Sequence, residues 1–362
     1  MKAVSLAHRW LGGLLGLLLA LLGLTGTLLL HRDFWLGLTL KHAGDPLRPG
    51  MQVDTVTALL DASNPPSTVV LANESLGVHR LIYAGSDAGA YADQSGHIVQ
   101  RWASLSERPE LWLFDLHRHL LSGDTGETIA GWAALCGLVF VVTGSMLWWR
   151  TRRTFAPRLL PRRTSRSAIV RHHRDLGIVV APFLLVTFVT GAMMALRPVE
   201  AALLAPFRAR LSLAEFRAPP PAVFAPTPGR IDWRGILTRA QTRFPEAAIR
   251  IVSRPQRSGA PIVIRIRQAG DWLPNGSTFL WFDPGSGRLA GIRTPDARPS
   301  ATSLAMAEYP IHAGKVGGWV WRTILTLAGL SLTMLGTLAV TAFWTGQSAR
   351  STRYARRRPL ER

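Results

Sequence analysis

The sequence predicts an integral membrane protein in which a bundle of four membrane-spanning helices carries two small α+β modules outside the membrane. Three observations indicate this fold class. Of the 362 residues, 48% are hydrophobic. Four apolar windows are long enough to cross a hydrocarbon layer of about 30 Å. Short histidine and glycine motifs recur in the same order in both halves of the chain, which predicts an internal duplication that relates the first span to the third and the second to the fourth.

The four apolar windows extend over Trp10–Leu30, Ile129–Trp149, Ile178–Leu196 and Trp319–Trp344. The first window lies where a secretory signal would lie. Its apolar run exceeds the roughly 7–15 residues of a signal-peptide core. His31-Arg32-Asp33-Phe34 follows it in place of a small-residue cleavage site. We therefore expect this segment to be retained as the first span.

The net charge of +20 is concentrated beside the spans. Eight arginines and no acidic residue lie between Arg150 and Arg171, and six arginines with one glutamate lie between Arg350 and Arg362. Arginine clusters next to spans are typical of cytoplasmic segments. We therefore expect both termini in the cytoplasm of a multi-pass protein of the bacterial inner membrane. We expect these arginines to interact with the lipid bilayer and not with a nucleic acid.

These features divide the chain into eight segments. They are the first span (1–32), a first external module (33–116), an outer histidine segment with the second span (117–150), a basic cytoplasmic loop (151–171), the third span (172–197), a second external module (198–311), an outer histidine segment with the fourth span (312–345), and a basic cytoplasmic tail (346–362).

Each external module is expected to contain one helix followed by four short strands. Alternating apolar and polar residues and glycine-containing turns indicate the strands. The first module has a helix over 54–62 and strands over 68–71, 78–83, 90–92 and 98–102; after a proline-rich linker (219–229), the second has a helix over 232–244 and strands over 248–253, 262–267, 278–282 and 288–292. Modules of this size are marginally stable alone, so we expect them to pack on each other or on the helix ends.

The histidine motifs recur with fixed spacings. A His-Arg-x-Leu-Gly sequence starts at His8 and again at His173, and Thr-Gly follows 17 residues after each histidine. The second and fourth spans are preceded by His117 and His312. A parallel duplication implies a two-fold axis along the membrane normal. This symmetry pairs His8 with His173 at the inner face and His117 with His312 at the outer face.

Small residues accompany these histidines along the helices. On a helix, His8 and the glycines of the first span fall within a band of roughly 80°. A histidine at the edge of a smooth glycine face suits a flat macrocycle such as haem, which needs an axial nitrogen and close approach to the backbone. The glycines proposed to pack against the cofactor are Gly12, Gly16, Gly23, Gly26, Gly137, Gly144, Gly177, Gly191, Gly329 and Gly336. The alternative is that they serve helix packing, with the histidines at the lipid interface.

The other candidate haem ligands are the single cysteine and three further histidines. Cys136 is the only cysteine, so a cysteine-linked haem is excluded and axial ligation must be non-covalent. His31 could compete for an outer haem, although it points about 140° away from His8 on an ideal helix. His172 and His119 are alternative ligands, with an interfacial or supporting role preferred. Two bis-histidine sites stacked across a four-helix bundle would form an electron path through the membrane.

These motifs resemble the PepSY-associated transmembrane-helix family. The resemblance is carried by His-Arg-x-Leu-Gly with Thr-Gly in the first span, Leu116-His117-Arg118 before the second, and Ile311-His312 with Gly314 before the fourth; the external modules resemble PepSY domains. The family includes bacterial inner-membrane ferric-siderophore reductases, among them a ferrioxamine reductase. The resemblance implies two haem b groups on His8, His117, His173 and His312, and reduction of an Fe(III)-siderophore at the periplasmic face. The fourth span departs from the pattern, because Leu335-Gly336 replaces Thr-Gly.

No dinucleotide-binding glycine motif occurs in the sequence, so the electron donor must be a separate partner, either a cytosolic flavin reductase or membrane quinol. Two other functions compete with electron transfer. One is a haem-free scaffold whose PepSY-like modules bind or restrain a periplasmic partner. The other is a transporter, which the absence of charged residues within the spans disfavours.

Overall fold

The computed structural model describes residues 2–158, 165–207, 211–221, 224, 226–227, 229–295 and 300–355, with side chains to residue 345. Parts of the predicted basic loop, of the proline-rich linker and of the basic tail lie outside the described residues. The chain forms two compact units, each considered by itself. One comprises Met1–Leu30, Leu113–Ala201 and Ile311–Arg362, and the other comprises His31–Trp112 and Ala202–Pro310.

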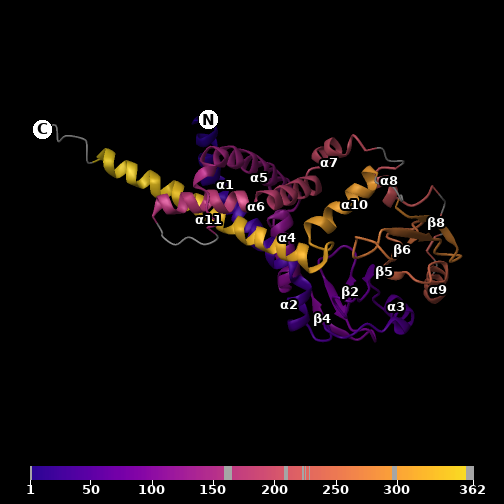
Figure 1. Cartoon of the computed structure of the whole chain (residues 1–362). Coiled ribbons are helices and arrows are strands. Elements are labelled where there is room, and N and C mark those ends of the chain that lie inside the picture. The colour runs from indigo at the N-terminus through magenta and orange to yellow at the C-terminus, as the bar shows by residue number, and fades with distance from the viewer. Residues whose placement is uncertain are drawn as a thin grey trace. The chain divides into compact units, whose positions relative to one another are not determined.

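The first unit is built on four long helices, which Figure 1 shows with the shorter elements of the chain. They are α1 (Lys2–Leu30), α5 (Gly123–Thr151), α6 (Arg166–Ala195) and α11 (Gly318–Ala355). All four are long and apolar enough to span a membrane, as predicted. Helix α1 packs along α11 and contacts α5, and α6 packs along α5 and contacts α11. The four spans therefore form a bundle in which each has two neighbours.

Glycines set the close approach of α1 and α11. A Cβ added at Gly16 would lie 2.7 Å from the carbonyl oxygen of Gly336, and one at Gly23 would lie 2.7 Å from that of Gly329. Real Cβ atoms do not approach so closely. Backbone contact through small residues is a common way for membrane helices to associate. These glycines therefore determine how near the first and fourth spans lie.

Two short helices precede the second and fourth spans. Helix α4 (Pro109–His119) contains His117, and α10 (Ala301–His312) ends at His312. Residues with positive φ follow each of them, including Leu120 after α4 and Gly314 after α10. A left-handed residue stops a helix and redirects the chain. Each histidine is thus held on a short helix of its own, directly before a span.

The second unit contains one eight-stranded antiparallel sheet in the order β4-β3-β2-β1-β5-β6-β7-β8. The strands are β1 (Thr68–Val70), β2 (His79–Ile82), β3 (Gly89–Ala92), β4 (Ile98–Trp102), β5 (Ala248–Ser253), β6 (Ile262–Arg267), β7 (Thr278–Phe282) and β8 (Leu289–Arg293). The two predicted groups of four strands meet where β1 pairs with β5, in register from Thr68 opposite Ser253. Pairing removes two exposed strand edges, which explains why the modules form a single sheet.

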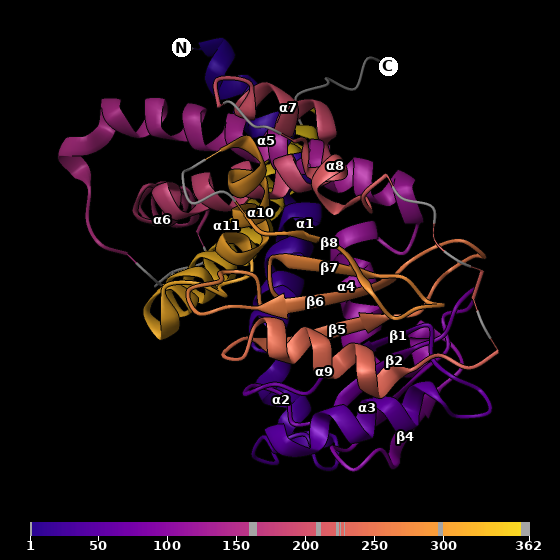
Figure 2. The same ribbon diagram turned by 90° about the vertical axis from the view of Figure 1, so that its right-hand side faces the viewer.

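Helices α3 (Gln52–Leu60) and α9 (Trp233–Arg243) lie side by side over one face of this sheet (Figure 2). Their apolar side chains, such as Val56 and Ile236, pack with Ile264 and Leu280 in a fully buried core. Smaller apolar clusters centre on Trp102 and on Trp281. The shorter helical elements are α2 (Arg32–Thr39), α7 (Arg197–Leu204), α8 (Leu213–Arg217), η1 (Pro49–Met51), η2 (Leu105–Glu107) and η3 (Arg152–Thr154).

Candidate metal centre

The helical unit holds two pairs of facing histidines. His8 on α1 and His173 on α6 have ring centroids 6.3 Å apart, with their ring planes at 86°. His117 on α4 and His312 on α10 also have centroids 6.3 Å apart, with their planes at 49°. The pairs are the ones expected from the repeat symmetry. Along α1, the 17 residues between His8 and Thr25, which contacts His117, correspond to a rise of about 25 Å.

The spacing within each pair fits two imidazoles that share one metal ion. Metal–imidazole bonds are about 2 Å long, and a five-membered ring with bonds of about 1.33 Å places each atom about 1.1 Å from the ring centre. Two imidazoles bound on opposite sides of one ion would therefore have centroids about 6.2 Å apart. Both pairs have 6.3 Å. The same separation also occurs in direct ring contacts, and the His8 and His173 rings lie edge to face.

Threonine side chains hold three of the four imidazoles by Nδ1. Thr143 Oγ1 lies 2.8 Å from Nδ1 of His8, Thr25 Oγ1 lies 2.9 Å from Nδ1 of His117, and Thr190 Oγ1 lies 3.0 Å from Nδ1 of His312. Each hydroxyl also donates to the carbonyl four residues earlier, at 2.6–2.8 Å.

These contacts bear on the tautomer of the rings. With the hydroxyl hydrogen bonded to the helix carbonyl, the oxygen accepts from the imidazole and Nδ1 carries the proton. The lone pair is then on Nε2, as in a histidine that ligates a metal through Nε2.

Enclosure by the surrounding protein lowers the pKa of His117 to about 4, with a further contribution from His312, and enclosure also lowers the pKa of His312 to about 4. Both outer imidazoles are thus neutral at pH 7, which is the form that ligates a metal. All four imidazoles nevertheless keep part of their surface uncovered.

The glycine after each of these threonines lies against the imidazole. A Cβ at Gly26 would lie 3.0 Å from Cε1 of His117, one at Gly144 would lie 3.4 Å from Cε1 of His8, and one at Gly191 would lie 3.3 Å from Cε1 of His312. The Thr-Gly pair therefore has two roles at each histidine: the hydroxyl accepts from Nδ1 and the glycine makes room for the ring edge. The sequence showed the motif but not this contact, because the histidine is on another helix.

The other candidate glycines are placed differently. Gly16, Gly23, Gly329 and Gly336 lie at the contact of α1 with α11, and a Cβ at Gly12 would meet Ala339 on α11 at 3.7 Å. Helix packing, the alternative raised from the sequence, accounts for these five. A Cβ at Gly137 would meet the ring of Phe188 on α6. Gly177, four residues after His173, has open space where a side chain would be.

Of the alternative histidine ligands, His119 and His172 are not paired with a second imidazole among the described residues. His119 is held by two carboxylates, with Nδ1 2.7 Å from Asp115 and Nε2 3.7 Å from Glu127. His31 stands at the start of α2. His172 is only 1% exposed and lies next to the backbone of Arg158.

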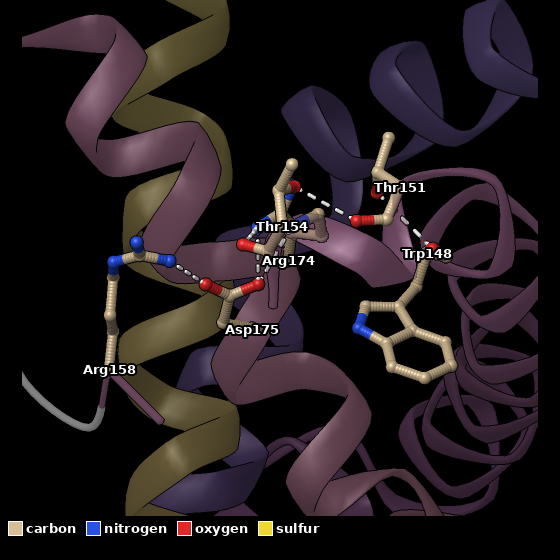
Figure 3. Close-up of polar contacts among 6 residues, drawn as sticks. All are labelled: Trp148, Thr151, Thr154, Arg158, Arg174 and Asp175. Atoms are coloured by element: carbon tan, nitrogen blue, oxygen red, sulfur yellow. Dashed lines mark hydrogen bonds and ion pairs between the residues drawn. The ribbon is translucent and has the colours of Figure 1, made fainter. Parts of the chain in front are cut away.

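A buried ion-pair network adjoins His173 on α6 (Figure 3). Asp175 is fully buried and pairs with Arg158 and with Arg174, whose Nε lies 2.7 Å from the carboxylate. Arg174 also donates to the hydroxyl and the carbonyl of Thr154, at 2.8 and 2.9 Å. A buried carboxylate needs such partners to remain charged. The network fixes the segment after α5 to α6, close to the His8–His173 pair.

The fold defines a multi-pass membrane protein with four spans and a β-sheet unit. The sequence model of the PepSY-associated TM region family matches residues 5–345. The chain therefore belongs to this family, which confirms the resemblance seen in the sequence. No curated protein matches the chain.

Proposed function

We propose that the protein is a transmembrane electron-transfer protein with two b-type haems, one held by His8 and His173 and the other by His117 and His312. The observation that carries the proposal is the common geometry of the two pairs. In both, the centroids are separated as in two axial ligands of one iron. Bis-histidine ligation leaves four positions on iron, which a porphyrin fills.

The orientation follows from the arginine clusters. Eight arginines lie between Arg150 and Arg171, a stretch that covers the end of α5, the connection to α6 and the start of α6. By the positive-inside rule this connection and both termini are cytoplasmic, in a bacterial inner membrane. His8 and His173 then belong to the cytoplasmic end of the bundle, and His117 and His312 to the periplasmic end. The sheet unit is periplasmic.

The reaction we propose is reduction of an Fe(III)-siderophore at the periplasmic face, with release of Fe(II). Bound haem would supply one-electron redox chemistry at each pair. A reduced flavin from a cytosolic reductase or a membrane quinol would supply the electrons, because the chain has no nucleotide-binding motif. The chain itself orients the four imidazoles, fixes the tautomer of His8, His117 and His312 through threonine, and surrounds the rings with apolar helices.

The two halves are, in our proposal, copies of one unit that contains an inner histidine, a span, a PepSY-like module, an outer histidine and a second span. Three features support the duplication. Each half has a helix followed by four antiparallel strands, and the strand order is symmetrical about the β1–β5 junction. Each pair takes one histidine from each half. The threonine contacts of His117 and His312 use equivalent positions, Thr25 and Thr190.

Single histidine variants test the proposal. In haem-replete cells, His8→Ala and His312→Ala should each lose about one of two haems, measured from the reduced-minus-oxidised visible spectrum of purified protein. His97→Ala is the matched control, because its side chain is 83% exposed, and it should keep the wild-type spectrum. Colourless wild-type protein would contradict the proposal and favour the haem-free scaffold. Trapping of Fe(II) outside the cytoplasmic membrane, with a panel of Fe(III)-siderophores, then tests the substrate.

A further inference from the structure

The sheet has a second face, opposite the one that α3 and α9 cover. In β6, Ile264 and Ile266 belong to the core under these helices, so Arg265 between them points to the second face. In β2, Arg80 points to the same face because its neighbour Leu81 belongs to that core. The strand register then aligns one row across the second face, formed by Tyr91, Arg80, Val70, Ile251, Arg265 and Phe279. The row is symmetrical about the β1–β5 junction, with an arginine and then an aromatic residue on each side.

The two arginines of this row are not matched by carboxylates. The Nε atoms of Arg80 and Arg265 are buried without a hydrogen-bond partner, and neither guanidinium forms an ion pair among the described residues. Two carboxylates act on them electrostatically, and both are engaged elsewhere. Glu110 pairs with Arg108 at 2.9 Å, and Asp271 accepts from two backbone N–H groups at 2.8 and 3.3 Å. Neither arginine therefore has an anionic partner of its own in the described part of the chain.

Two more arginines lie beside the row and share one carboxylate. Arg267 follows Arg265 by two positions on the same strand face, and Arg250 lies at the bulge of β5. Both have a guanidinium nitrogen 3.8–3.9 Å from Oε2 of Glu74, whose side chain is 67% exposed. Arg250 itself is only 3% exposed, and it also donates to two backbone carbonyls. Four guanidinium groups thus have one carboxylate at ion-pair distance among the described residues.

These guanidinium groups remain charged, and their charge favours a bound anion. Burial lowers the pKa of Arg80, and burial together with nearby Arg217 lowers the pKa of Arg265 to about 10, so both are protonated at pH 7. A partly buried cation without a counter-ion destabilises the folded chain. Arg265 is held in place, because it donates to the Gly276 carbonyl and its Cζ lies 4.9 Å from the ring centroid of Phe279. A planar guanidinium in a fixed position suits a carboxylate or another pair of anionic oxygens.

We propose that the second face of the sheet binds the Fe(III)-siderophore in an anionic form, with Arg80 and Arg265 as two symmetrically placed contacts for its anionic oxygens. The inference rests on the proposed function, which supplies the identity of the ligand. The two arginines lie three strand spacings apart, about 14 Å, which suits a chelate with several anionic groups better than one small anion. Chelates with catecholate or carboxylate oxygens have this chemistry, whereas a chelate with a net positive charge does not.

The test measures binding without electron transfer, in full-length, haem-loaded protein in nanodiscs of phosphatidylcholine, which contain no anionic lipid. Ga(III) replaces Fe(III) in the probes because it is not reduced. Isothermal titration calorimetry compares three ligands: the anionic Ga(III) complex of a tris-catecholate siderophore, the cationic Ga(III) complex of a tris-hydroxamate siderophore with a free ammonium group, and inorganic phosphate. The tris-catecholate complex should bind most tightly, and its affinity should fall as the salt concentration is raised.

Arg80→Gln and Arg265→Gln should each weaken binding of the tris-catecholate complex by about tenfold or more. Arg101→Gln is the matched control, because Arg101 is an exposed arginine on β4 of the same sheet, and this variant should bind as the wild type does. Without ligand, Arg80→Gln should melt at or above the wild type, because it removes a charge that has no partner. This measurement separates a lost contact from a misfolded protein.

Equal affinity for the anionic and cationic complexes, tighter binding of phosphate, or unchanged affinity in both Arg80→Gln and Arg265→Gln would overturn this inference. The haem content of the same preparations tests the proposed function separately. Protein with two haems that binds no anionic complex would overturn the inference alone. Haem-free wild-type protein that binds the anionic complex would support the inference and contradict the proposed function.

Discussion

The contact between α1 and α11 predicts opposite outcomes for two alanine substitutions one turn apart on the same helix face. At Gly16, an added Cβ would lie 2.7 Å from Gly336 O and 2.8 Å from Val340 Cγ2. Ordinary contact begins at 3.4 Å, so α1 and α11 would have to separate by up to 0.7 Å. Overpacking of this kind costs about 1–3 kcal/mol. At Gly12, the nearest atom is 3.7 Å away, and alanine gains up to about 1 kcal/mol of helix propensity.

The assay is thermal unfolding of both purified variants in the same detergent. Gly16→Ala should melt a few degrees below Gly12→Ala, and Gly12→Ala should melt at or above the wild type. Both substitutions add one methyl group to α1, so membrane insertion and intrinsic propensity change equally. A Gly16→Ala protein that melts at or above Gly12→Ala would refute close backbone contact between the first and fourth spans.

Three further predictions concern other parts of the chain. Burial lowers the pKa of His79 to about 4, and its Nδ1 accepts from the Ala72 N–H at 3.1 Å. The unfolded chain therefore binds more protons than the folded chain between pH 6.5 and 4. As the pH falls through this window, up to about 3 kcal/mol of the free energy of unfolding should be lost. In His79→Asn, the free energy of unfolding from denaturant titrations should depend less on pH than in the wild type. An unchanged pH dependence would contradict the role given to His79. Gly177→Leu fills open space beside His173 and should lower haem content while leaving unfolding of the haem-free protein nearly unchanged; full haem content would show that no cofactor lies there. Asp175→Asn should destabilise the helical unit by about 1–3 kcal/mol, because two arginines lose their buried partner, and an unchanged melting temperature would count against the network.

Much of the fold could be predicted because the signals are local. Apolar windows of about 20 residues identified the four spans, and alternation identified the strand Ile262–Arg267 at its observed bounds. The pairing of β1 with β5 could not be predicted, because it joins residues about 180 positions apart. The short helices α4 and α10 were expected only as histidine segments, since their ends depend on positive-φ residues such as Leu120.

The candidate site could be predicted in part, for a related reason. The repeat indicated which histidines would be neighbours, and the structure brings those pairs together. The roles of the small residues were harder to separate, because the glycines of α1 share a face whether a helix or a cofactor lies against them. Gly16 lies against α11 and Gly26 against His117. The threonine contacts cross between helices, so spacing along one helix could not indicate them.

The haem content of the purified wild-type chain tests the central claim most directly. Protein from haem-replete cells, assayed by its pyridine haemochrome against protein concentration, should contain about two non-covalent b-type haems per chain. Haem-free wild-type protein would contradict the account. Haem that remains bound when His8, His117, His173 and His312 are all replaced would contradict it as well.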